Sequence, residues 1–301
     1  MASMRDIKRR KSSIQSTQQI TKAMKLVSTV KLQKAKNRAE QTDPYFNYMY
    51  KTVSSMLARS GNINHPYLTA GDSKKKAVVV ITSNRGLAGG YNSNIVKLIT
   101  GGDFNKEDLD IYAVGGKGAE ALERRGYHIA DLETEMMEAP TYPDAASLCK
   151  RVLDAFTSGE VGEIYLAYTH FKNTVSQEAK LIKLLPVEIE PDSEENQAAD
   201  SNILMNYEPN EEEALDMIIP KYVTSLFYGA LVEAVASENG ARMQAMDSAN
   251  KNGEELLNSL SLQYNRQRQA KITQEITEVA AGAKARRQQL QKKKRSQSTC
   301  K

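Results

Sequence analysis

Residues Lys76–Asn92 read KAVVVITSNRGLAGGYN, and this stretch decides the fold class. Apart from the lysine, its first seven residues are apolar or β-branched, a pattern typical of a buried strand. Gly86, Gly89 and Gly90 predict a tight turn, and a helix is expected from about Ser93 to Thr100. A strand that passes through a glycine-rich turn into a helix is the opening unit of an α/β domain.

Further strands and helices alternate along the chain after this unit. Strands are expected at 109–114, 127–132, 163–171 and 180–185, and helices at 118–125 and 144–156. Asp144 is the expected N-cap of the last of these helices. The order predicts a small, Rossmann-like, mainly parallel α/β domain over residues 76–190, with helices on the faces of its sheet.

The N-terminal residues 1–59 predict one long helix, because they contain no glycine. Pro44 is expected to kink or break this helix. A narrow apolar stripe on an otherwise polar helix is typical of a coiled-coil seam. The residues expected to form this stripe are Ile7, Ile14, Ile20, Met24, Val27, Val30, Leu32 and Ala35.

The C-terminal residues 210–290 predict a second long helix, with Pro220 near its first turns. Residues 229–249 are rich in Gly, Ala and Ser, so another backbone is expected to approach them closely. The apolar stripe beyond them, expected to pack within the helix pair, consists of Leu257, Leu260, Tyr264, Ile272, Ile276 and Val279. The two terminal helices are therefore predicted to form a long antiparallel two-helix coiled coil on the α/β domain.

Charge is unevenly distributed although the net charge is only +4. Residues 1–40 carry a net charge of +9 and residues 284–301 a net charge of +8, so the middle of the chain is acidic. Basic ends favour an acidic partner. The basic tail at 291–301 is expected either to be disordered or to lengthen the C-terminal helix.

Candidate chemistry is sparse. The loop 83–92 and the glycines of 115–118 lie where a Rossmann-type fold holds phosphate, but their spacing matches neither GxGxxG nor GxxxxGK[ST]. His65, His128 and His170 lack metal-ligand spacing. We therefore expect no cofactor, no metal and no active site.

Other functional classes are also disfavoured by the sequence. Cys149 and Cys300 are too far apart to indicate a disulfide framework or a zinc site, and a solvated rim is expected for the cluster of Glu133, Glu135 and Glu138. The longest apolar run is far shorter than the ~20 residues of a membrane span, so no span is expected. Residues 1–40 contain no aromatic side chain, which disfavours nucleic acid.

Four motifs resemble one family. Residues Ile14–Ser28 (IQSTQQITKAMKLVS) are similar to the N-terminal helix of F-type ATP synthase gamma subunits, and Arg268–Ala283 (RQAKITQEITEVAAGA) resembles the C-terminal signature of that family. Residues 83–92 and 114–118 are similar to its two central glycine motifs. The four motifs occur in the family's order, and the resemblance covers roughly residues 2–285.

The resemblance implies the central rotor of an F-type ATP synthase. In that family the two-helix shaft stands inside a ring of three alpha and three beta subunits, and the base contacts the epsilon subunit and the membrane c-ring. Rotation of the c-ring, driven by ions, changes nucleotide affinity in the beta subunits, which are the catalytic ones. A peripheral location on the cytoplasmic side of a bacterial cell membrane follows, and the coupling ion, H⁺ or Na⁺, is left open.

The resemblance also implies particular contact residues. Arg268, Gln269 and Thr273 match positions that contact the moving loops of beta, and Lys22 and Met24 match the facing part of the N-terminal helix. The family signature is carried by Ile272, Thr273, Gln274, Glu275, Glu278, Gly282 and Ala283. The cysteine pair of light-regulated relatives is absent, so no thiol switch is expected. The alternatives are a stand-alone coiled-coil scaffold with an α/β binding module and a nucleotide-dependent enzyme that uses residues 86–91.

Overall fold

The computed structural model describes residues 3–59, 65–102, 104–187 and 210–298. Its contacts divide the chain into two compact units. The sheet unit consists of Met24–Met246, and the terminal unit consists of Met1–Ala23 with Asp247–Lys301. Two long helices, α1 (Met4–Arg59) and α6 (Glu211–Ser298), contribute residues to both units.

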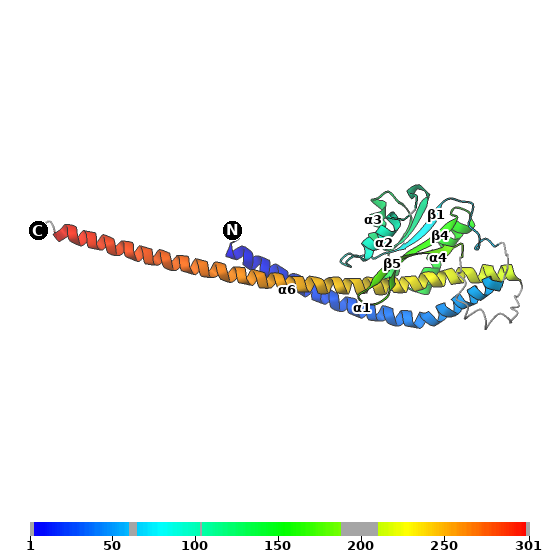
Figure 1. Cartoon of the computed structure of the whole chain (residues 1–301), viewed down its shortest axis with the longest axis horizontal. Coiled ribbons are helices and arrows are strands. Elements are labelled where there is room, and N and C mark those ends of the chain that lie inside the picture. Colours follow the sequence, from blue (N-terminus) through cyan, green and yellow to red (C-terminus); the bar gives the residue numbers. More distant parts are fainter. Residues whose placement is uncertain (1–2, 60–64, 103, 188–209, 299–301) are drawn as a thin grey trace. The chain divides into compact units, whose positions relative to one another are not determined.

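The sheet unit is built on five strands in the order β3-β2-β1-β4-β5 (Figure 1). The first four strands along the chain are mutually parallel, and β5 runs antiparallel beside β4. Their bounds are β1 Lys76–Ile81, β2 Leu109–Val114, β3 His128–Glu133, β4 Glu163–Phe171 and β5 Gln177–Leu185. The predicted mainly parallel sheet is confirmed.

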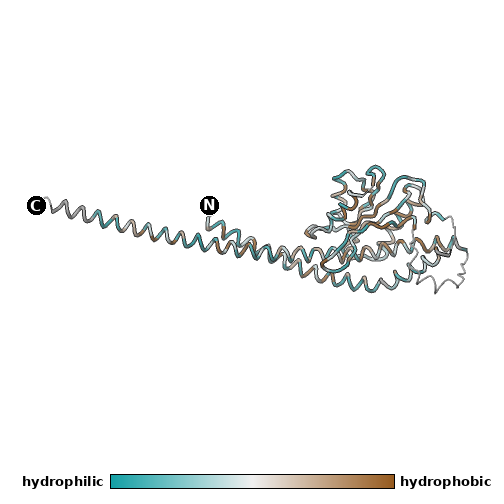
Figure 2. Tube along the Cα trace, viewed as in Figure 1, coloured by the Kyte–Doolittle hydropathy of each residue, from teal (hydrophilic) through white to brown (hydrophobic). Residues whose placement is uncertain are grey.

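Helices cover both faces of the sheet, as the apolar run of β1 requires. Val78 and Val80 pack against α2 (Tyr91–Thr100) and α3 (Gly116–Glu123) on one face. Ala77, Val79 and Ile81 face the other side, where α4 (Tyr142–Thr157) and parts of α1 and α6 pack. Two short 3-10 helices, Lys106–Asp108 and Glu135–Met137, complete this unit. Figure 2 shows the strands among the most hydrophobic parts of the chain.

The N-cap of α4 is Thr141, so the expectation of Asp144 is wrong by three positions. The Oγ1 atom of Thr141 accepts a hydrogen bond from the N–H of Asp144 and donates one to the Asp144 carboxylate. Asp144 therefore occupies the third helical position, where its negative charge is stabilised by the positive end of the helix dipole.

Pro44 does not break α1, which continues as one helix to Arg59. The helix is held against the sheet unit on both sides of the proline, by buried Ala35 before it and buried Val53 after it. This packing offsets the loss of one backbone hydrogen bond. Of the two outcomes expected at Pro44, a kink or a break, the break is therefore wrong.

The seam of α1 differs in phase from the predicted stripe. Positions 7, 14, 21, 28 and 35 follow one heptad, and all five are buried or half-buried. Ile20, Val27 and Val30 lie outside this seam and are 59%, 57% and 57% exposed, which corrects the expectation that they form it. The seam instead contains polar residues such as Thr21 and Ser28, and a search for apolar residues alone does not identify these positions.

Polar contacts join the two helices of the terminal unit. Gln18 Nε2 donates to the backbone oxygen of Asn250 at 3.1 Å, and Thr21 Oγ1 donates to Asn250 Oδ1 at 2.6 Å. A Cβ at Gly253 would lie only 2.9 Å from Gln18 Cγ, so the helices approach closely there. The helices run antiparallel, and Ile7 is buried while Leu257, Leu260 and Tyr264 are half-buried.

Gln267 is the last residue of α6 whose side chain is half-buried in this seam. Every residue from 268 to 289 is exposed. Ile272, Ile276 and Val279 are 46%, 64% and 73% exposed, so the expectation that they pack within the helix pair is wrong. The reason is length, because α1 begins at Met4 and supplies no partner for these turns. The described part of α6 continues to Ser298 and includes residues 291–298 of the basic tail.

Among the residues that the structure describes, one helix is long and apolar enough to cross a membrane. It is the Glu212–Gln289 part of α6, and 61% of its apolar window is buried inside the protein. Burial of this kind is the ordinary behaviour of a core helix, so these properties are weak support for a span.

Candidate partner interface on the C-terminal helix

The candidate contact residues of α6 lie on one exposed face of a single helix. At ~3.6 residues per turn, Arg268, Gln269 and Thr273 fall within an arc of about 140°. The same arc holds Ile272, Ile276 and Val279. We call these six residues the mixed face, because apolar side chains lie between a guanidinium on one edge and an amide and a hydroxyl on the other.

The polar groups of the mixed face are available to another molecule. No described residue forms a hydrogen bond or an ion pair with the side chains of Arg268 or Gln269. Thr273 Oγ1 donates to the backbone oxygen of Gln269 at 2.9 Å, which leaves its lone pairs unused. The mixed face thus combines apolar area with polar groups that can still form hydrogen bonds, as protein interfaces do.

The other signature residues form contacts within the helix. Gln274 Nε2 donates to Glu278 Oε1 at 2.8 Å, and Lys271 pairs with Glu275 at 3.9 Å. Pairs at this spacing stabilise an exposed helix by only ~0.2–0.5 kcal/mol each. A Cβ at Gly282 would meet no described atom within 4 Å, so packing within the chain does not explain this glycine.

The two candidates on α1 lie in different environments. Lys22 belongs to the terminal unit and is exposed, with no hydrogen bond or ion pair to the described residues. Met24 belongs to the sheet unit and is half-buried.

The glycine motifs hold the sheet unit together and leave no phosphate site at α3. The first three N–H groups of α3 already donate to the protein itself, to Asn84 Oδ1, Ser83 O and Thr82 Oγ1. A Cβ at Gly118 would lie 2.4 Å from Thr82 Oγ1, and one at Gly115 would lie 2.1 Å from Thr82 O. Gly115 and Gly118 therefore serve close packing in the turn from β2 into α3.

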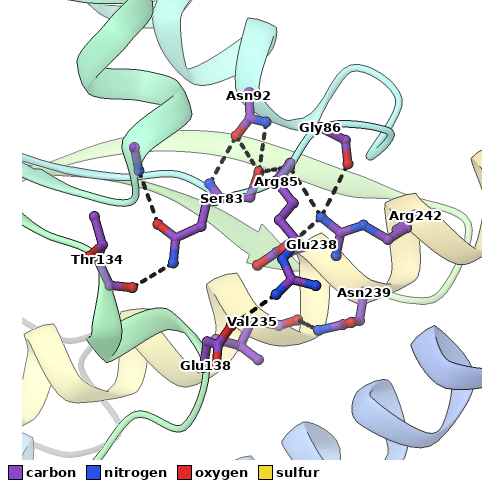
Figure 3. A network of polar contacts seen from close by, with 12 residues as sticks. Ser83, Arg85, Gly86, Asn92, Thr134, Glu138, Val235, Glu238, Asn239 and Arg242 are labelled. Atoms are coloured by element: carbon purple, nitrogen blue, oxygen red, sulfur yellow. Dashed lines mark hydrogen bonds and ion pairs between the residues drawn. The ribbon is translucent and has the colours of Figure 1, made fainter. Parts of the chain in front are cut away.

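A polar network fixes the loop after β1 to α6 (Figure 3). Arg242 Nη2 donates to the backbone oxygen of Arg85 at 3.3 Å and forms an ion pair with Glu238 at 2.7 Å. Arg85 in turn lies 3.6 Å from Glu138. Burial raises the pKa of Glu238, and the neighbouring Arg242 opposes this rise.

Sequence reasoning did not identify the Arg242–Glu238 pair. The available signal was an acid and a base four residues apart within a segment, 229–249, that otherwise contains mostly small and apolar residues. At Gly240 a Cβ would lie 3.4 Å from the side chain of Gln177 and 3.5 Å from that of Phe171, so side chains rather than another backbone make the closest approach there.

Metal chemistry finds no support in the part of the chain that the structure describes. No group of three or more His, Cys, Asp or Glu side chains there is arranged to hold an ion. His65 and His170 instead pair with carboxylates of α6, with Asp216 at 3.2 Å and with Glu233 at 2.7 Å.

A family model described as ATP synthase matches residues 3–285. The chain is also 68% identical over 289 residues to an ATP synthase gamma chain from Lachnoclostridium phytofermentans, a match that covers 95% of this chain and 99% of the relative. The chain belongs to the ATP synthase gamma chain family. The resemblance inferred from the four motifs is thereby confirmed.

Other members of the gamma chain family match over nearly their whole length. An ATP synthase gamma chain, sodium ion specific, from Acetobacterium woodii is 40% identical over 94% of this chain and 98% of its own. A gamma chain from Alkaliphilus metalliredigens is 43% identical over 94% of this chain and 98% of its own.

Solved structures agree with the family assignment. The central stalk and c-ring structure of the Tetrahymena thermophila mitochondrial ATP synthase contains a chain 26% identical to this one, with a TM-score of 0.56 over 76% of this chain and 99% of the other. A chain in a structure of the Euglena gracilis mitochondrial ATP synthase shares the fold, with a TM-score of 0.68, 17% identity and 94% coverage of both chains.

Proposed function

We propose that this gamma chain is the central rotor of an F-type ATP synthase. It would couple ion-driven rotation of a membrane c-ring to conformational change in a ring of three alpha and three beta subunits. The observation that carries the proposal is the exposed mixed face of α6, on a chain whose family is that of ATP synthase gamma chains. The stand-alone scaffold is not favoured, because the match to these gamma chains extends over nearly the whole chain.

The proposed contact is made by residues on one side of the helix. Arg268, Gln269 and Thr273 would bind carboxylates and carbonyls on the moving loops of beta, and Lys22 and Met24 would form the facing contact on α1. Because the helix presents different side chains around its axis, rotation would bring a different surface to each beta subunit in turn. Each net hydrogen bond formed there is worth ~0.5–1.5 kcal/mol, enough to bias a beta conformation without locking it.

The chain would be a non-catalytic subunit. Arg242, Glu238 and the donors of α3 are all engaged by the protein's own groups, which supports a structural role for the loops at the carboxyl ends of the strands. Nucleotide chemistry would then belong to the beta subunits.

The division of the chain follows from this role. Residues 1–59 and 210–290 would form the shaft, residues 76–190 the base, and residues 291–301 a basic tail. The base would contact the epsilon subunit and the c-ring, which places the chain on the cytoplasmic side of a bacterial cell membrane as a peripheral part of the complex.

The test is reconstitution with the host's alpha and beta subunits. We expect a complex of three alpha, three beta and one gamma chain whose steady ATP hydrolysis depends on this chain. The location is checked separately, by sedimentation of the chain with inverted membrane vesicles and its release together with alpha and beta. A chain that elutes alone and leaves hydrolysis unaffected would contradict the rotor proposal.

A matched pair of glutamine variants tests the contact itself. Gln269→Ala removes an amide from the mixed face, whereas Gln274→Ala removes the same group from outside it. We expect Gln269→Ala to lower hydrolysis by roughly two- to tenfold, the equivalent of one net hydrogen bond, and Gln274→Ala to leave it near the parent rate. Equal effects of the two variants would disprove the assignment of the mixed face.

A further inference from the structure

A pocket of about 330 Å³ opens between α4 and α6 in the sheet unit. Its volume lies within the ~300–1,000 Å³ range of small-molecule sites. Neither the glycine motifs nor the mixed face of α6 includes any of its lining residues, so the role proposed above gives this pocket no function.

The two helices supply the walls from residues that share a face. Ala146, Lys150 and Leu153 follow one another at spacings of four and three on α4, and Pro220 and Thr224 are one turn apart on α6. Thr224 Oγ1 donates to the backbone oxygen of Pro220 at 2.7 Å, and the proline has no N–H. The helix backbone therefore offers few free polar groups here, and the carbon atoms of Ala146, Leu153 and Pro220 make the lining partly apolar.

Two lysines in the pocket lining have ammonium groups that form no ion pair with any described residue. Lys150 and Lys221 are exposed, and neither forms an ion pair or a hydrogen bond with any residue that the structure describes. Asp154 is the one acidic residue in the lining, so the charge of the described lining is positive. Long, flexible lysine side chains can turn inward together toward a single anion.

Two tyrosines complete the lining, and aromatic neighbours hold their rings. Tyr67 stacks on Phe156 with the ring centroids 6.3 Å apart, and Tyr142 meets Tyr228 edge-on at 5.8 Å. Burial raises the pKa of both phenols, so both are neutral at physiological pH and can donate a hydrogen bond. Rigid rings with a polar tip suit a ligand that is apolar at one end and charged at the other.

We propose that this pocket binds a small amphipathic anion, a carboxylate or sulfonate carried on a short apolar group, with Lys150 and Lys221 at the charge and the carbon atoms of Ala146, Leu153 and Pro220 around the apolar part. Such a ligand would contact α4 and α6 together. It would therefore stabilise the packing of these two helices in proportion to its occupancy.

The test uses the purified full-length chain and the fluorescent probe 8-anilinonaphthalene-1-sulfonate. We expect saturable binding of one probe molecule, which octanoate displaces and inorganic phosphate alone does not. Thermal unfolding, followed by circular dichroism, is expected to shift upward with octanoate.

Three variants locate the site. Ala146→Leu fills the pocket, and the pair Lys150→Gln with Lys221→Gln removes its charge; each is expected to weaken probe binding at least about tenfold. The matched control, Lys34→Gln with Lys97→Gln, removes two exposed lysines of the same unit and is expected to leave binding within about twofold.

Several outcomes would overturn the proposal. They are the absence of saturable binding, unchanged binding in the charge-removal pair, or displacement by phosphate as effective as that by octanoate. If Ala146→Leu does not fold, the charge-removal pair and its control decide alone. Failure of this test leaves the reconstitution result untouched, because the pocket residues are not part of the mixed face.

Discussion

The turn from β2 into α3 is closed by residues that have no room for a side chain. Gly115 has φ +96°, and Gly118 donates its N–H to Thr82 Oγ1 at 2.9 Å. The same hydroxyl donates to the backbone oxygen of Gly115 at 3.1 Å. Thr82 is fully buried, so it is unable to move away from either glycine without losing a buried hydrogen bond.

Alanine at Gly118 is therefore expected to destabilise the chain severely. The added Cβ would lie 2.4 Å from Thr82 Oγ1, and we expect a loss of at least about 3 kcal/mol in the free energy of unfolding, through overpacking and a lost hydrogen bond. Gly116→Ala is the control, because a Cβ there meets nothing within 4 Å, and its effect should stay within about 0.5 kcal/mol. Urea unfolding of the two variants measures the difference, and equal midpoints would refute this account.

The Arg242–Glu238 pair makes stability depend on pH in a defined direction. Each side chain is only 11% exposed, and burial raises the pKa of Glu238 even with Arg242 beside it. A carboxyl whose folded pKa is raised contributes most to stability at low pH, and this contribution is lost as the pH rises through the folded pKa. Arg242 limits that loss at neutral pH.

Removing the arginine should therefore cost more at pH 7 than at pH 4.5. We expect Arg242→Ala to lose about 3–5 kcal/mol at pH 7, where an unpaired carboxylate would stay buried, and clearly less at pH 4.5, where Glu238 protonates. Arg124→Ala is the control, since its pair with Glu120 is exposed and its loss should matter little at either pH. Denaturant unfolding at both pH values decides, and a loss from Arg242→Ala that is independent of pH would count against this mechanism.

At the scale of elements, the sheet was predictable and the helix seams were not. Buried strands can be recognised in sequence by their apolar, β-branched residues, and β2 and β4 match their predicted bounds. The strand β5 begins at Gln177, three residues before its predicted start at residue 180. The seam of α1 contains Gln18 and Thr21, whose partner Asn250 lies more than two hundred residues away. Local hydrophobicity carries no information about such a pairing, so it misplaced Ile20 and Val27.

In the candidate site too, some features could be predicted from the sequence and others could not. Arg268, Gln269 and Thr273 could be named only through family resemblance, because an exposed polar helix face has no signature of its own. That Ile272, Ile276 and Val279 share this face depends on where α1 begins relative to α6. Apolar spacing alone assigned these three residues to the interior of a helix pair.

Two isoleucines that look alike in sequence should behave differently when replaced. Ile276→Gln alters a side chain that is 64% exposed, so the free energy of unfolding of the isolated chain should change by less than about 0.5 kcal/mol. Ile7→Ala removes a side chain that is only 2% exposed and should cost about 2–4 kcal/mol within the terminal unit. Hydrogen exchange of residues 4–23 and 247–267 measures both effects, and faster exchange in the Ile276 variant would show that Ile276 is packed after all.

At the scale of the whole molecule, the important feature is that the turns of α6 after Gln267 have no partner turns on α1. The described seam ends at Gln267, the mixed face begins at Arg268, and the family model ends at residue 285. The turns that the described part of the chain leaves uncovered are therefore the turns to which the resemblance assigns the family signature. A surface that does nothing for the fold of its own chain is one whose apolar residues have to be explained by another molecule.

Two truncations separate the fold from the proposed function. A chain that ends at Gln267 keeps every described seam residue, so its unfolding temperature should stay within about 2 °C of that of the full chain, the shift expected for less than ~1 kcal/mol. A chain that ends at Ala285 keeps the mixed face as well and serves as the control. In complexes with alpha and beta, the 285-residue chain should sustain ATP hydrolysis near the full rate, whereas the 267-residue chain should lower it about tenfold, since several contacts of ~0.5–1.5 kcal/mol are lost together. Equal hydrolysis by the two truncated chains would mean that the exposed turns of α6 do not transmit rotation to the catalytic subunits.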